Sequence, residues 1–181
     1  MDPRSFENYK EDPQCDAFLK NAKAQHDVKN ALKLSDVNPD EFDALVLPGG
    51  HAPMFDLAQD ETLAHLVSSI YEKGGVVAGI CHGPVGLLNA KLSDGQYLVK
   101  GKHLTGFSNE EEEDMGLTKE MPFLLEDHIQ ERGAVYEKAD KPYGEKVVVD
   151  GRVITGQNPA SAPKFGQAIL EALRESRRKE E

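Results

Sequence analysis

The sequence is poor in the residues that mark several classes of protein. It has 181 residues, no tryptophan and only two cysteines, Cys15 and Cys81, so it holds no disulfide framework. No apolar run is long enough to cross a bilayer, and the first forty residues hold no continuous apolar segment of the kind that a secretory signal needs. The sequence therefore predicts a cytoplasmic protein.

Positive charge is also scarce. The chain has 21 Lys and Arg against 32 Asp and Glu, which gives a formal net charge of -11. Its one dense basic cluster, residues 174–179, lies among glutamates, as is typical of a solvated helix end. We therefore expect no nucleic acid and no membrane as partners. The length and the 39% of hydrophobic residues instead predict one globular domain over residues 1–181.

Apolar runs that alternate with helical patterns predict an α/β fold. The runs at 42–47 and 76–80 stop at glycine-containing turns and are typical of buried parallel strands. Two hairpins are predicted, one at 97–107 that turns at Lys100–Lys102 and one at 146–156 that turns at Asp150–Gly151. Helical patterns cover 15–32, 60–73, 82–91, 108–116, 119–133 and 161–178. Together they predict a mostly parallel sheet sandwiched by helices, with β-hairpin additions.

Cys81 lies where the second apolar run stops, in the segment GICHG. A glycine on each side permits a sharp strand-to-helix turn that exposes the middle side chain. A helix beginning near Gly83 would favour the thiolate and lower the pKa of Cys81. The backbone N–H of His82 is placed to face an oxyanion beside the sulfur. The alternative is a buried structural cysteine with His82 as a hydrogen-bonded neighbour, but the pattern favours a nucleophile.

A second glycine-rich loop, PGGHAP, follows the first apolar run. The carboxyl ends of neighbouring parallel strands meet in one crevice, so this loop is expected beside Cys81. We expect the N–H of Gly50 to complete an oxyanion hole, and Gly49 and His51 to line the pocket. No Cys/His spacing is typical of zinc, and no phosphate-binding loop is present. The sequence therefore predicts no metal and no cofactor.

Five acids follow Ser108 and Asn109 without a break. Ser108 with Glu111 forms a capping-box pattern, which predicts a solvated helix start for four of the five. One acid that turned inward would orient His82, as the third member of a triad orients a base. Spacing alone does not choose among Glu111, Glu112 and Glu113.

Four ordered motifs, LVLPGGHAP, VVAGICHGP, LTGFSNEEE and ITGQNPASA, resemble the ThiJ/PfpI superfamily and in particular its glyoxalase III and heat-shock-chaperone branch. The resemblance implies a flavodoxin-like, class I glutamine-amidotransferase-like fold, with Cys81, His82 and Glu112 as the catalytic residues. It also implies conversion of small 2-oxoaldehydes, chiefly methylglyoxal, into D-lactate-type hydroxy acids without glutathione.

The resemblance leaves other functions open. The alternative functions are a stress-response holdase chaperone, a protein deglycase, an inactive relic and, least favoured, a cysteine peptidase or amidase. The resemblance is also compatible with a homodimer. Relatives begin with a strand, a helix and a strand that carry a glutamate beside the cysteine, and neither Glu7 nor Glu11 matches that motif. The resemblance therefore predicts an N-terminally shortened domain with weakened turnover.

Overall fold

The computed structural model describes residues 11–180, the side chains of 177, 179 and 180 excepted. The chain divides into two compact units, residues 1–37 and 38–181, so that a single domain over residues 1–181 stays a prediction. In the first unit, helices α2 (Pro13–Lys20) and α3 (Ala22–Lys29) precede the short 3-10 helix η1 (Leu34–Asp36). The one helix predicted at 15–32 is therefore two. The break lies at Asn21, whose side chain accepts the N–H of Ala24 and so caps α3.

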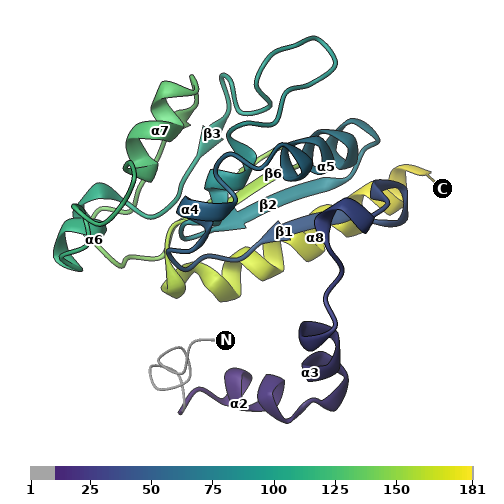
Figure 1. Cartoon of the computed structure of the whole chain (residues 1–181), viewed down its shortest axis with the longest axis horizontal. Coiled ribbons are helices and arrows are strands. Elements are labelled where there is room, and N and C mark those ends of the chain that lie inside the picture. Colours follow the sequence, from purple (N-terminus) through teal and green to yellow (C-terminus); the bar gives the residue numbers. More distant parts are fainter. Residues whose placement is uncertain (1–10, 181) are drawn as a thin grey trace. The chain divides into compact units, whose positions relative to one another are not determined.

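A four-stranded sheet forms the centre of the second unit (Figure 1). Its order is β1 (Ala44–Leu47), β2 (Val76–Ile80), β6 (Val153–Gly156) and β5 (Val147–Asp150). Strand β2 pairs in parallel with β1 and with β6, whereas β5 is antiparallel to β6. The predicted mostly parallel sheet is confirmed, as is the hairpin at 146–156.

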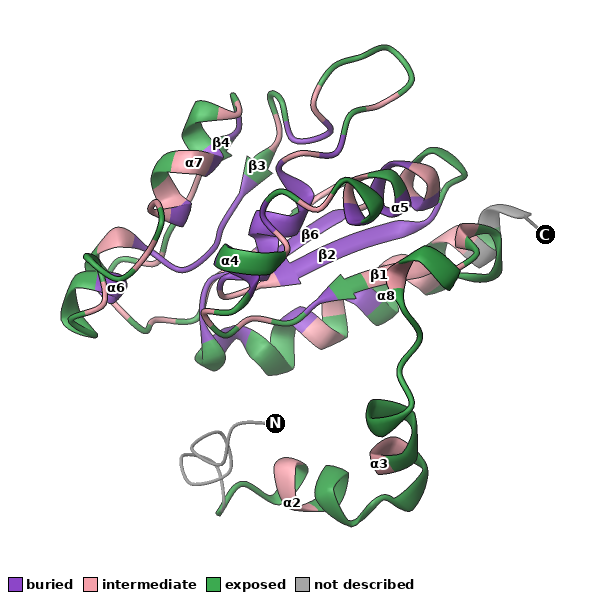
Figure 2. Ribbon diagram, viewed as in Figure 1, coloured by how far each residue is buried: buried purple, intermediate pink, exposed green. Residues whose placement is uncertain are grey.

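Helices cover both faces of the sheet (Figure 1). Helix α5 (Glu61–Glu72) lies on one face, and α8 (Ala162–Glu180) packs Phe165 and Ile169 on the other, against β2 and β6. Because β2 is covered on both sides, its residues 76–79 are buried without alternation (Figure 2). Strand β1 lies at the edge of the sheet, and Val46 is 43% exposed. The prediction of a buried strand is therefore correct for β2 and wrong for β1.

The hairpin predicted at 97–107 is wrong. The two-stranded ladder there joins β3 (His103–Leu104) in parallel with β4 (Val135–Tyr136). Long-range hydrogen bonds replace those of a hairpin, since Gly101 N–H donates to the Gly133 carbonyl and the Asp150 carboxylate accepts the N–H of His103. These non-local partners outweigh the local turn signal.

The remaining elements are short. They are η2 (Pro39–Glu41), α4 (Pro53–Asp56), η3 (Gly83–Leu87), α6 (Asn109–Asp114), α7 (Leu125–Glu131) and η4 (Pro159–Ser161). The helix predicted at 82–91 is only the five-residue 3-10 helix η3. The helix predicted at 119–133 begins at Leu125, beyond Pro122, which has no N–H to donate. Within the described residues no helix has both the length and the apolar character needed to cross a membrane.

Candidate active site

Cys81 occupies a strained turn between β2 and η3. Its φ is 61°, in the left-handed region that non-glycine residues rarely adopt. Two backbone hydrogen bonds of 2.9 Å hold it there: its N–H donates to the carbonyl of Gly156, and its carbonyl accepts the N–H of Phe107. The sharp turn predicted from GICHG is therefore present, and strand β6 and the loop before α6 support it.

The glycine-rich loop after β1 lies against this turn. A Cβ at Gly49 would overlap the Cys81 side chain and the Ile80 carbonyl, so only glycine permits the close approach. Gly50 has a φ of 86°, which also favours glycine. The backbone N–H groups of Gly50 and His82 both lie close enough to the Cys81 sulfur to lower its pKa. The structure thus brings together the two donors that the sequence predicted for an oxyanion hole.

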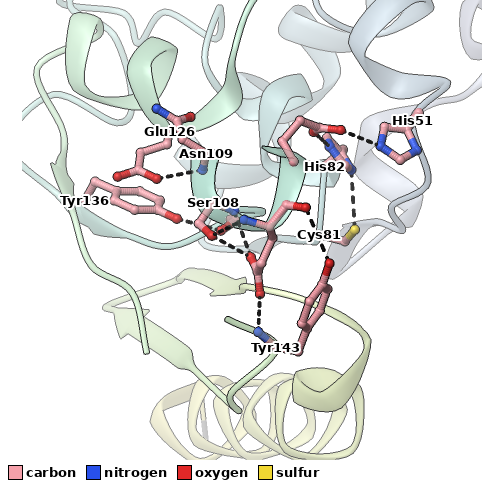
Figure 3. A network of polar contacts seen from close by, with 11 residues as sticks. His51, Cys81, His82, Ser108, Asn109, Glu126, Tyr136 and Tyr143 are labelled. Atoms are coloured by element: carbon pink, nitrogen blue, oxygen red, sulfur yellow. Dashed lines mark hydrogen bonds and ion pairs between the residues drawn. The ribbon is translucent and has the colours of Figure 1, made fainter. Parts of the chain in front are cut away.

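Glu112 of α6 lies between two imidazole rings. Its Oε2 is 2.6 Å from Nε2 of His82, and its Oε1 is 2.8 Å from Nε2 of His51. The other ring nitrogen of His82, Nδ1, lies 3.4 Å from the sulfur of Cys81 (Figure 3). His82 is fully buried and Glu112 is 4% exposed, whereas the His51 side chain is 28% exposed. One polar chain therefore runs from Cys81 through two buried groups to a partly exposed histidine.

The Glu112 carboxylate determines which nitrogen of His82 carries a proton. A carboxylate only accepts hydrogen bonds, so Nε2 of each ring must donate. In neutral His82 the Nδ1 atom is then unprotonated, and this is the atom that faces the thiol. His82 is thereby oriented as an acceptor for the Cys81 proton.

Burial keeps both reactive groups neutral. Burial raises the pKa of the Cys81 thiol to about 11. The backbone N–H groups of Gly50 and His82 lower this pKa in part, whereas the nearby charges of Glu111 and Glu112 raise it further. Burial likewise lowers the pKa of His82, although the hydrogen bond to Glu112 raises it. The lowered thiol pKa predicted from a helix dipole is therefore wrong, because η3 is a single short 3-10 helix and desolvation outweighs it.

A second buried acid holds α6 in place. The Ser108 hydroxyl accepts the Glu111 N–H, and the Glu111 carboxylate accepts the Ser108 N–H, so the predicted capping box is confirmed. Glu111 has no exposed surface, and its Oε1 also accepts the N–H of Tyr143 and the side-chain amide of Asn158, each at 2.8 Å. The prediction that four of the five acids are solvated is therefore wrong for Glu111. Its position in the capping box gave no signal of these distant partners.

Of the acids left open by spacing, Glu112 is the one that contacts His82, whereas Glu113 is exposed. Glu112, His51 and His82 each also offer one atom that can bind a metal ion, and these atoms lie within 4.8 Å of one another. The three residues come from separate segments of the chain, so no sequence spacing indicated this cluster.

Comparisons with known proteins match the chain to one protein family and to proteins named as glyoxalases. Residues 19–172 match the DJ-1/PfpI family. The chain is 39% identical over 153 residues to a probable glutathione-independent glyoxalase, hsp3103, of Schizosaccharomyces pombe, covering 81% of this chain and 59% of the relative. It is 35% identical over 153 residues to glyoxalase 3 of Candida albicans, covering 81% of this chain and 64% of that protein. The chain thus spans about three fifths of the length of these curated relatives.

Solved structures agree with this placement. The 24 kDa rapid encystment protein of Francisella tularensis superposes with a TM-score of 0.83 and 42% identity, over 87% of this chain and 70% of that one. Glyoxalase III of Candida albicans superposes with a TM-score of 0.74 and 30% identity, over 84% of this chain and 70% of that one.

The raised thiol pKa predicts a steep pH dependence of alkylation. In a Cys15→Ser chain, where Cys81 is the sole thiol, the iodoacetamide rate constant should rise about tenfold per pH unit from about pH 7 to about pH 10, because the thiolate fraction keeps growing below a pKa of about 11. Mass spectrometry of quenched samples measures the rate, and the Cys15→Ser, Cys81→Ser chain corrects for reaction elsewhere. A plateau below pH 9 would show that the fold lowers this pKa instead.

Proposed function

The chain belongs to the DJ-1/PfpI family, and we propose that it converts small 2-oxoaldehydes, methylglyoxal first among them, into 2-hydroxy acids without glutathione. The proposal makes it a glyoxalase III-type hydro-lyase, a D-lactate dehydratase run toward lactate. It draws on the names of its relatives, the glyoxalases of two yeasts, and on the site at Cys81. The observation that carries it is the arrangement of a thiol, an unprotonated imidazole nitrogen and a buried carboxylate in hydrogen-bond sequence.

The first step forms a carbon–sulfur bond. Nδ1 of His82 accepts the thiol proton as the Cys81 sulfur attacks the aldehyde carbon, and Glu112 stabilises the imidazolium that results. The electron pair of the C=O bond moves onto its oxygen. The N–H groups of Gly50 and His82, which face the sulfur, donate to that oxyanion. A thiol with a raised pKa becomes a nucleophile only as its proton leaves.

The second step moves a proton between neighbouring carbons. His82 returns its proton to the oxyanion, then removes the hydrogen of the carbon bonded to sulfur and passes it to the oxygen of the second carbon, so that an enediol forms. His82 next takes the hydroxyl proton of the first carbon and delivers it to the second carbon, which leaves a carbonyl at the first carbon, now a thioester. Water hydrolyses the thioester and releases the hydroxy acid and the free thiol. The sum is one aldehyde plus one water, with no external oxidant.

The exposed apolar side chains of the second unit do not favour the holdase alternative. The exposed large hydrophobic side chains of the second unit include Phe55 on α4, Val149 on β5 and Leu170 on α8. They lie on different elements rather than along one.

The reaction itself gives the first test. The chain should release D-lactate from methylglyoxal in the absence of glutathione, detected with a D-specific lactate dehydrogenase. Cys81→Ala should abolish release because the nucleophile is lost, whereas Cys15→Ala should leave it unchanged, since Cys15 takes no part in the hydrogen bonds that join Cys81, His82 and Glu112. A folded chain that forms neither lactate nor a Cys81 adduct, or a Cys81→Ala chain as active as the parent, would refute the proposal.

The assignment of the acid is tested within the acid run. We expect Glu112→Gln to lower kcat/KM by about 100-fold, because the imidazolium loses its charged partner. Glu113→Gln is the matched control, being the same change one residue on at an exposed position. Its kcat/KM should stay within about twofold of the parent, as for a surface substitution. Equal losses in both variants would remove Glu112 from the mechanism.

A further inference from the structure

We propose that His51, His82 and Glu112 form a binding site for one divalent transition-metal ion of the zinc class. The three residues come from the loop after β1, the turn after β2 and helix α6, and the fold brings one ligand atom from each within 4.8 Å of the others. Among the described residues this is the one such cluster of three. The hydrogen bonds of 2.6 and 2.8 Å through Glu112 already aim both Nε2 atoms at the carboxylate.

The donor set suits zinc and its neighbours. Two imidazoles with one carboxylate make a set of three protein ligands that leaves a fourth position open for water. A hard cation such as magnesium prefers an all-oxygen site and is disfavoured here. The His51 side chain is 28% exposed and the Glu112 side chain 5%, so His51 is the ligand that an ion from solvent would meet first.

The charge of the site also favours a cation. Glu111 and Glu112 are both buried, and no described Lys or Arg forms an ion pair with either. Glu111 is satisfied by neutral N–H and O–H donors from Ser108, Tyr143 and Asn158. Buried negative charge without a cationic partner is costly, so a divalent ion beside Glu112 offsets a cost that the protein's own residues leave in place.

Metal binding would compete with the proton transfer. The ion bonds Nε2 of both rings, which displaces the protons that these atoms donate to Glu112. Neutral His82 then carries its proton on Nδ1, the atom that faces the Cys81 sulfur, and can no longer accept the thiol proton. The ion is therefore an inhibitor. This consequence rests on the proposed function, whereas the binding itself does not.

Cobalt(II) is the probe, because Co²⁺ binds the same types of ligand as Zn²⁺ and absorbs visible light when its coordination is tetrahedral. The titration uses the full chain with Cys81→Ala, so that no thiolate at the site contributes. We expect one equivalent of Co²⁺ to bind with tetrahedral visible bands. Adding His51→Gln should weaken Co²⁺ binding by more than about tenfold. Loss of a residue that only hydrogen-bonds to a metal ligand already weakens binding by about tenfold, and loss of a ligand should weaken it more.

His103→Gln in the same background is the matched control. His103 also contacts a carboxylate, that of Glu137 at 2.7 Å, but 53% of its side chain is exposed, so its loss should leave the affinity unchanged. Binding without tetrahedral bands, undiminished binding in His51→Gln, or loss of binding in His103→Gln would overturn the proposal.

A second measurement needs no substitution at the ligands. In the Cys81→Ala chain, Co²⁺ should broaden the ring-proton resonances of His51 and His82 before those of the other histidines; broadening of another histidine first would overturn the site. With Cys81 intact, Zn²⁺ should inhibit D-lactate formation and a chelator should restore it. An inactive chain that binds Co²⁺ at His51 supports the metal site and not the glyoxalase, and an active chain that fails to bind Co²⁺ refutes the metal site alone.

Discussion

One buried carboxylate, that of Glu112, determines how the rest of the site is arranged. Its two oxygens accept hydrogen bonds from two imidazoles, and a charge removed from water is stable only when its oxygens are satisfied in this way. The capping box at Ser108 and the buried Glu111 fix the helix that carries it. The strained turn at Cys81 is fixed in the same way by backbone bonds to β6 and to the loop before α6. Nucleophile and acid thus belong to two segments held by separate sets of hydrogen bonds, and His82 contacts both.

The thiol and the imidazole therefore rest as a neutral pair rather than as a thiolate–imidazolium ion pair. Burial that raises the pKa of the thiol and lowers that of the imidazole keeps the proton on sulfur until an electrophile is in place. A neutral thiol resists oxidation and stray alkylation, because the thiolate is the reactive form. The two N–H groups beside the sulfur are already oriented, so they cost no reorganisation when an oxyanion forms. The buried site thus protects the thiol from side reactions and keeps the two N–H groups in place for an oxyanion.

Local sequence patterns predicted the strands β2 and β6, the hairpin at 146–156, helix α5 and the elbow at Cys81, because each depends on neighbours in the chain. The failures share a different cause. The parallel pairing of β3 and the burial of Glu111 are set by partners far along the chain. The same holds for the thiol pKa, which depends on desolvation and on the Glu111 and Glu112 charges rather than on the short helix that follows Cys81. Sequence motifs indicated Glu112, but only the three-dimensional structure shows its hydrogen bond to His51.

The protonation state of His82 tests this account most directly. In ¹⁵N-labelled protein near pH 7, long-range ¹H–¹⁵N correlation should show a neutral His82 ring with its proton on Nε2 and none on Nδ1, because Nε2 donates to Glu112. Glu112→Gln should release this preference, since an amide can donate as well as accept. A doubly protonated His82, or a neutral ring with its proton on Nδ1, would contradict the claim that a shared buried carboxylate prepares the imidazole to take the thiol proton.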